Sequence, residues 1–256
     1  MKVIVAIKQV PVRDSTLKVR SDERWIEEEN LEYEINEPDA YALEEALQLK
    51  DQHGAEVVVL CAGPERSGAV IREALAKGAD RAIHLVADDL GSLDSLGMAA
   101  RLAEAIRPEK PDLILTGLQS EDLGLGQTGV VLAEVLDLPH STIIMQVEVT
   151  GTEIEVKREL EEGWFQKIKM PMPALLTIQS GIGRLRYATL MGIKKAKTKE
   201  VKIIAASSLS PTQPCVASLE RIYLPEKKKQ VQLLNGSPAE VAAQLVEKLK
   251  YEVRVI

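Results

Sequence analysis

The sequence has little of what builds disulfide frameworks, clustered metal sites or membrane spans. Its two cysteines, Cys61 and Cys215, lie far apart, so we expect neither a disulfide framework nor a paired-cysteine metal site. Long apolar runs such as 57–62 have the length of a strand and fall far short of a bilayer span. The apolar block after Met1 is too short for an export signal. These absences predict a soluble, cytoplasmic chain with reduced thiols.

Aromatic residues and excess positive charge are also scarce. Aromatic side chains make up 3% of the 256 residues and Phe165 is the only phenylalanine, so the core must consist of Val, Ile, Leu and Ala, which is typical of a parallel sheet. The 32 Lys and Arg against 39 Asp and Glu give a net charge of -7, which excludes a globally basic nucleic-acid binder. With 45% hydrophobic residues the chain can build a real core, which excludes disorder over most of its length.

Residues for hydrolytic or metal chemistry are not grouped. His53, His84 and His140 fall on different expected elements, and none lies in a zinc-protease or nucleophile-elbow motif. No cluster of Cys and His has the spacing of metal ligands. We therefore expect no metal site and no nucleophile paired with a base.

Short apolar segments alternate with amphipathic ones over the first half of the chain. This alternation predicts a Rossmann-like, doubly wound α/β fold with a mostly parallel sheet. The expected strands are 3–7, 57–61, 82–86 and 113–116, and the expected helices are 38–52, 64–77, 92–106 and 126–136.

The pattern changes near Thr142. Segments 143–149, 153–158 and 174–178 read as strands with no long helix between them, which favours added antiparallel strands. Segment 179–198 has neither the helix nor the strand period, and such a stretch usually serves a function or reaches a partner. A strand at 201–205, a linker at 207–214 and a helix at 238–250 follow. We thus predict a nucleotide-binding domain over 1–200, including a loop at 184–199, and a C-terminal arm over 201–256.

A glycine-rich turn follows the fourth expected parallel strand. Its glycines free backbone N–H groups, and Thr128 adds a hydroxyl beside a helix N-terminus, a setting that favours phosphate. A helix start that needs flexible glycines and binds nothing explains the spacing equally well. The residues concerned are Gly117, Gln119, Asp122, Gly124, Gly126, Gln127, Thr128 and Gly129. We expect Asp122 to face solvent or a sugar hydroxyl, because it would repel a phosphate.

Other small or polar residues are expected at the same sheet edge. Ala6 ends the first strand, Ala62 ends the second, and the stretch Asn36, Glu37, Pro38 and Asp39 precedes a helix. Together they could let a flat ring approach the backbone. Taken singly, each is explained better as core, tight turn or helix cap.

The loop 184–199 combines apolar residues with cations on an acidic protein. Leu190, Met191 and Ile193 lie beside Lys194 and further lysines, so the loop could dock on a partner with an acidic surface. The alternative is a solvated charge run whose apolar residues fold back onto the domain.

Taken in order, these segments resemble the beta subunits of the electron transfer flavoproteins from Met1 to about Val201. The most specific stretch runs from Val156 through Gly163 and Gln166 to Thr177. The other matching segments are Val5–Lys8, Asn36–Asp39 leading into Ala42–Ala46, Gly78–Arg81, Gln127–Gly129 and Arg186–Leu190.

The resemblance implies a heterodimer with a larger alpha subunit that holds most of an FAD. The pair would carry electrons from flavin-dependent dehydrogenases to a quinone reductase, and the beta chain would break no bonds itself. It implies AMP binding by Ala6, Asn36–Asp39, Ala62 and the loop Gly117–Gly129. It also implies that Leu190 anchors the dehydrogenase and that Glu159 helps hold the mobile flavin domain.

Departures from the family pattern leave alternatives open. Leu123–Gly126 replaces a run of aspartates, and Ser210–Thr212 looks more like the electron-bifurcating branch, which holds a second FAD where AMP would lie. A nucleotide-sensing module with a similar core would explain the crevice but not the loop 184–199. An adenine-nucleotide hydrolase would need a catalytic base or metal that the sequence does not offer.

Overall fold

The computed structural model describes residues 1–87, 93–209, 215–225 and 231–255. By their contacts the residues form two compact units, Met1–Arg221 and Ile222–Ile256, and each is treated by itself. Ser210–Pro214, which belongs to the predicted linker, lies outside the described residues.

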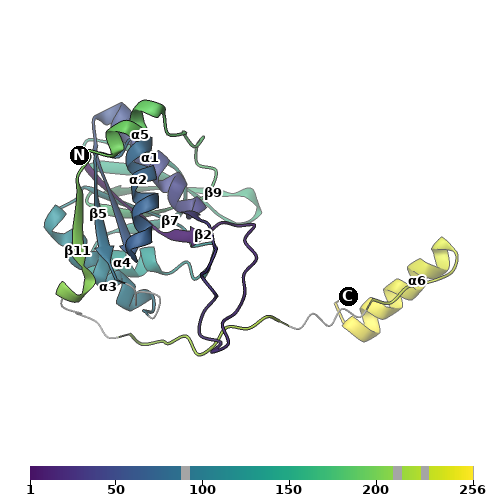
Figure 1. Ribbon diagram of the computed structural model, residues 1–256. Helices are drawn as coiled ribbons and strands as arrows, with labels where there is room; N and C mark the ends of the chain where they lie inside the picture. The colour runs from purple at the N-terminus through teal and green to yellow at the C-terminus, as the bar shows by residue number, and fades with distance from the viewer. Residues whose placement is uncertain (88–92, 210–214, 226–230, 256) are drawn as a thin grey trace. The chain divides into compact units, whose positions relative to one another are not determined.

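The first unit is built on a nine-stranded sheet with the order β11-β5-β4-β1-β6-β10-β7-β8-β9 (Figure 1). All neighbours from β11 to β7 pair in parallel, and β8 and β9 extend the sheet antiparallel. A separate ribbon joins β2 to β3. The strands are β1 (Lys2–Ile7), β2 (Gln9–Pro11), β3 (Tyr33–Ile35), β4 (Glu56–Gly63), β5 (Arg81–Val86), β6 (Leu113–Gly117), β7 (His140–Thr150), β8 (Glu153–Glu159), β9 (Phe165–Pro171), β10 (Ala174–Ile178) and β11 (Val201–Ala205).

Helices cover both faces of the sheet. Buried residues of α1, α2 and α5 share one core cluster, and those of α3 and α4 share the cluster on the opposite face. The helices are α1 (Glu37–His53), α2 (Gly68–Lys77), α3 (Ser95–Ile106), α4 (Thr128–Leu136), α5 (Leu190–Ala196) and, in the second unit, α6 (Pro238–Lys248). This arrangement confirms the predicted Rossmann-like α/β class with a mostly parallel sheet.

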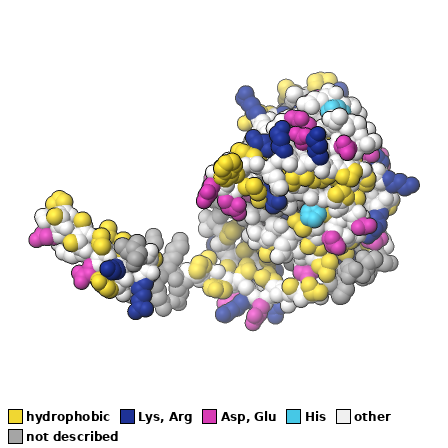
Figure 2. Space-filling view, turned by 180° about the vertical axis from the view of Figure 1, so that it is seen from behind, with side chains coloured by type: hydrophobic (Ala, Val, Ile, Leu, Met, Phe, Trp, Pro, Cys, Tyr) yellow, Lys and Arg dark blue, Asp and Glu magenta, His cyan; other side chains and the backbone are white. Residues whose placement is uncertain are grey.

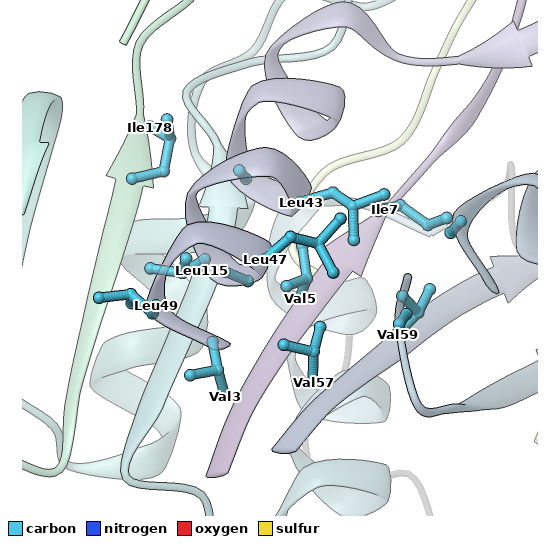
Figure 3. Close-up of a cluster of buried hydrophobic side chains, with 14 of the residues drawn as sticks. Val3, Val5, Ile7, Leu43, Leu47, Leu49, Val57, Val59, Leu115 and Ile178 are labelled. Atoms are coloured by element: carbon cyan, nitrogen blue, oxygen red, sulfur yellow. The ribbon is translucent and has the colours of Figure 1, made fainter. Parts of the chain in front are cut away.

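Branched aliphatic side chains fill the core, as the shortage of aromatic residues requires. Val3, Val5 and Ile7 of β1 point toward Leu43 and Leu47 of α1 (Figure 3). Ile4 belongs to the cluster on the other face, because side chains alternate along a strand. Since β1 is buried on both faces, its sequence is apolar from Val3 to Ile7 instead of alternating.

The order of the strands creates a switch point at the carboxyl edge. From β1 the chain proceeds outward to β4 and β5, and then crosses to β6 on the other side of β1. Connections after β1 and β6 therefore leave in opposite directions, and in open α/β sheets ligands bind outside the strand ends at such a point. The candidate residues of the first two turns and of the glycine-rich loop all follow strands of this edge.

Three local predictions were wrong. Strand β10 is parallel to β6 and β7 and not an antiparallel addition. Strand β9 was not predicted, because most of its side chains are exposed and show no apolar alternation. Helix α5 lies in the stretch 179–198, which was predicted to be irregular.

The second unit contains a well-capped helix without a core. The side chain of Ser237 accepts from the backbone N–H of Glu240, whose carboxylate in turn accepts from the backbone N–H of Ser237. No residue of α6 is buried, and a π-helical turn at Leu249–Val253 follows it. Figure 2 shows hydrophobic side chains on the surface of this unit. Leu245 and Val246 of α6 are both exposed. Among the described residues, no helix combines the length and the apolar character needed to cross a bilayer.

Candidate functional site

The carboxyl edge brings together the residues predicted to hold a nucleotide. Ala6 lies near the end of β1, Ala62 near the end of β4 and Gly117 at the end of β6. Asn36 occupies the position just before α1, and Glu37, Pro38 and Asp39 form the first turn of that helix. Gln119, Asp122, Gly124 and Gly126 lie in the connecting loop, Gln127 occupies the position just before α4, and Thr128 and Gly129 begin that helix. Their role in binding stays a prediction.

Asp39 joins the two strands that border the switch point. Its Oδ2 accepts from the backbone N–H of Lys8 at 2.8 Å, and its Oδ1 accepts from that of Gly117 at 2.9 Å. Burial raises the pKa of this carboxyl to about 7, and the two N–H donors hold it from rising further. Asp39 thus links the end of β1 to the end of β6 by hydrogen bonds. The sequence suggested only that it could cap the helix that follows.

Asn36 fastens the loop to the same helix start. Its Nδ2 donates to the carbonyl of Gln119 at 2.9 Å, and its Oδ1 accepts from the backbone N–H of Glu121 at 2.9 Å. Asn36 is buried, and its side chain does not cap its own helix. The amide therefore orders the loop instead of capping α1.

Asp122 forms an ion pair that the sequence did not reveal. Its carboxylate lies 2.7 Å from the ammonium of Lys8. Asp122 is an exposed residue, and its expected contact with a sugar hydroxyl stays a prediction. Burial favours a higher pKa for this carboxyl, but the charge and hydrogen bond of Lys8 outweigh it and lower the pKa. Lys8 directly follows β1, so its position at a strand end was the available signal.

The start of α4 is arranged like a phosphate site. Gln127 makes no side-chain cap, and its Oε1 instead accepts from the hydroxyl of Ser95 at 3.1 Å. The first N–H groups of the helix therefore have neither an intrahelical acceptor nor a cap from this residue. A Cβ at Gly129 would crowd Thr116 and Thr177, so glycine lets the helix approach the sheet. Gly124 and Gly126 have positive φ and shape the loop before it.

The chemistry of these residues is compatible with an adenine nucleotide. Ala6 and Ala62 carry only a methyl group each near the strand ends, and a ligand pocket of this kind is mostly apolar. The uncapped start of α4 offers N–H donors suited to a phosphate.

A second candidate surface is the outward face of α5. Leu190 is 81% exposed, Met191 61% and Ile193 46%, and Lys194 is exposed beside them. The alternative that these apolar residues fold back onto the domain is wrong for these side chains. Thr189 caps the helix by accepting from the N–H of Gly192.

Helix α5 is held firmly against α2. The guanidinium of Arg72 donates to the carbonyl of Ala196 at 2.7 Å, and Lys199 donates to the carbonyl of Leu75 at 2.9 Å. A Cβ at Gly192 would collide with the carbonyl oxygen of Ala76, so only glycine permits this approach. The exposed side chains are therefore carried by a fixed helix.

Arg186 ties the segment before α5 to α1. Its guanidinium contacts both oxygens of the buried Glu44, at 2.9 and 3.0 Å, and Asp51 at 2.9 Å. These hydrogen bonds and charges raise the pKa of Arg186, although burial works against them. The sequence analysis included Arg186 in the matching motif but missed its partners, which lie more than a hundred residues away.

Glu159 lies apart from both surfaces, at the end of β8. Its Oε2 accepts from the amide of Gln179 at 3.4 Å, and the side chain is half-buried. Exposed Trp164 and Phe165 follow in the turn and in β9. The role of Glu159 in holding a flavin domain stays a prediction.

Within the described ranges, no group of three or more His, Cys, Asp and Glu residues is arranged to hold a metal ion.

Comparison with known proteins gives consistent matches over nearly the whole chain. The model of the electron transfer flavoprotein domain matches residues 24–209. Over 257 residues the chain is 34% identical to a Methylophilus methylotrophus protein named electron transfer flavoprotein subunit beta, which covers 96% of this chain and 97% of the relative. Proteins of the same name from Bacillus subtilis and Mus musculus are 38% and 31% identical, and each alignment covers at least 95% of both chains.

Proposed function

The chain belongs to the electron transfer flavoprotein family as a beta subunit, and from this we propose that it pairs with an alpha subunit to shuttle electrons. The donors are flavin-dependent dehydrogenases, and the acceptor is a quinone reductase or another redox protein. The chain works as an electron carrier in the cytoplasm and breaks no bonds of its own.

The flavin supplies the redox chemistry when it is bound. We assign most of its contacts to the alpha subunit, while this chain contributes a rigid platform of nine strands. A structural AMP would lie in the crevice, with the ring against Ala6 and Ala62 and the phosphate at the start of α4. The small side chains and the uncapped helix support this assignment.

The main support for a docking function is a set of outward-facing apolar side chains on a fixed helix. Leu190, Met191 and Ile193 project from α5, which cannot turn them inward while Gly192 lies against Ala76. Such residues dominate binding when they fill a pocket on a partner. Lys194 and its neighbours would steer acidic surfaces, so this helix suits the docking of a dehydrogenase.

The substitution Leu190→Ala tests the docking role. The exposed side chain contributes nothing to the core, so we expect unchanged folding and flavin content. Loss of a filled pocket costs about 2 kcal/mol, or roughly thirtyfold in affinity for the dehydrogenase. The measurement is the rate of electron transfer as a function of dehydrogenase concentration.

Leu17→Ala is the matched control, because Leu17 is also exposed but lies outside α5. It should leave the transfer rate unchanged. Equal transfer rates in the Leu190→Ala variant and the unaltered complex would refute the docking role of α5.

A further inference from the structure

The carboxylate of Asp39 spans the two chain segments whose spacing sets the crevice. It receives the N–H of Lys8 just after β1 and the N–H of Gly117 at the end of β6, at 2.8 and 2.9 Å. The side chain is 7% exposed. One buried group therefore connects both sides of the switch point.

Gly117 is shaped to receive this carboxylate. A Cβ at position 117 would collide with the Asp39 carboxylate and with the backbone of residues 38 and 39. Glycine thus allows the end of β6 to reach the start of α1. This close approach, together with the hydrogen bond to Asp39, fixes the end of β6 against the start of α1.

Asp39 is buried, so little of its side chain is open to direct contact with a ligand. Both of its oxygens already accept backbone N–H groups, and the side chain is buried below the loop that Asn36 fastens. A group in this place acts on a ligand through the strand ends that it holds.

We propose that Asp39 is a positioning residue of the nucleotide crevice, which fixes the ends of β1 and β6 as a carboxylate and loosens them when it takes up a proton. The inference rests on the proposed function and deepens it, since it assigns a regulation to the same crevice. It predicts that nucleotide binding weakens as the medium becomes acidic.

Protonation changes what Asp39 can accept. An ionised carboxylate accepts on both oxygens, whereas the protonated form turns one oxygen into a hydroxyl donor. One of the two buried N–H groups then loses its acceptor. Burial raises the pKa of this carboxyl to about 7, so both forms occur near neutral pH.

Burial raises the pKa of Asp39, and Lys8, the only charged neighbour found to act on it among the described residues, works in the opposite direction. Lys8 attracts the charged form, but its ammonium is paired with Asp122. Glu37 lies on the same helix and Glu121 on the loop. Burial raises the pKa of the Cys61 thiol on β4 to about 12, so this neighbour stays neutral.

The test compares Asp39→Asn with Glu45→Gln in the complete complex with the flavin-bearing partner. An amide matches only one of the two N–H groups, so AMP binding should weaken about tenfold while flavin content stays unchanged. In the unaltered complex, nucleotide affinity should fall as the pH drops through about 7, and Asp39→Asn should remove this dependence except for the part that comes from the phosphate of AMP. Glu45 is a buried carboxyl of the same helix with a pKa raised to about 7. Among the described residues no hydrogen bond joins its side chain to β1 or β6, whereas two join Asp39 to Lys8 and Gly117, so the Glu45 variant should keep the dependence.

AMP itself titrates near pH 6, so adenosine serves as a second probe without a phosphate. Hydrogen exchange of peptides covering 113–129, corrected for the intrinsic rate, reports on the strand end directly. It should be faster in Asp39→Asn and, in the unaltered complex, at low pH.

Equal nucleotide affinity and pH dependence in Asp39→Asn and the unaltered complex would overturn the inference, as would faster exchange without any change in affinity. If Asp39→Asn does not fold, the adenosine affinity of the unaltered complex and of Glu45→Gln is measured as a function of pH. An affinity that does not change across this pH range contradicts the inference. A complex that binds no adenine nucleotide contradicts the proposed function instead, and the exchange measurement then still shows whether Asp39 holds the strand ends.

Discussion

Glu44 and Glu45 are adjacent, buried carboxyls on α1 with different surroundings. Glu44 is 5% exposed and is matched by the guanidinium of Arg186. Glu45 is 6% exposed, and no hydrogen bond or ion pair to a cation is found for it among the described residues. Burial, together with the charge of Glu44, raises the pKa of Glu45 to about 7. A buried charge without a partner is costly, so Glu45 retains its proton in the folded state to higher pH than in the unfolded chain.

This difference predicts how stability depends on pH. Between the unfolded pKa of 4.5 and the folded pKa of about 7, the folded chain holds a proton that the unfolded chain has released. Stability contributed by Glu45 therefore falls as the pH rises through this window and stays low above it. Glu45→Gln removes the titration, so thermal unfolding of the variant should lose less stability over this range, by on the order of 2 kcal/mol. An unchanged slope of stability against pH would contradict the assignment.

Contacts between distant residues limited what the sequence could predict of the site. Alanines and glycines at strand ends are recognisable, because parallel strands place their carboxyl ends at one edge. The link from Asp39 to Lys8 and Gly117 depends on which strands become neighbours, and so does the link from Arg186 to Glu44. Composition and periodicity carry no information on such pairings.

At the scale of single elements, the helices predicted best are those that bury one face. Helix α1 extends over Glu37–His53 against a prediction of 38–52, because its apolar stripe is continuous. Helix α5 has only seven residues and exposes Leu190, Met191 and Ile193, so the usual period of buried residues is absent. The exposed apolar residues are the reason for the departure from the period, and they are the residues that we propose for docking.

Close packing of α5 on α2 gives a second structural prediction. In Gly192→Ala the new Cβ meets the carbonyl oxygen of Ala76, which is backbone and cannot move aside cheaply. We expect a loss of about 1–3 kcal/mol in the free energy of unfolding, and weaker docking because α5 shifts. Denaturant unfolding and the electron-transfer assay measure the two effects.

Gly68→Ala provides the control at the start of α2. No atom lies within 4 Å of the Cβ that this substitution would add, so it should be neutral or slightly stabilising. Equal stability of both variants would show that α5 does not depend on the approach of Gly192.

At the scale of the whole molecule, the direction of β10 could not be predicted from the order of the strands along the chain. No helix intervenes between β7 and β10, which suggested antiparallel pairing, yet the chain returns through β8 and β9 and inserts β10 between β6 and β7. The fold class followed from alternating segments, while the strand order depended on contacts between residues far apart in sequence.

The second unit points to a partner. Helix α6 has a complete capping box but no buried residue, and its apolar side chains include Leu245 and Val246. Short helices are marginal in water unless an apolar face packs against something. We propose that this unit packs on the alpha subunit, which is the role predicted for the C-terminal arm from the sequence.

Isolation of the chain from its native cells, with identification of every bound nucleotide, tests the central claim most directly. The account predicts a yellow complex of this chain with one larger polypeptide in equal amounts, holding one FAD and one AMP; two FADs in place of FAD and AMP would assign it to the electron-bifurcating branch. A colourless homodimer, or a chain that never associates with a flavin-bearing partner, would contradict the account and favour a nucleotide-sensing module.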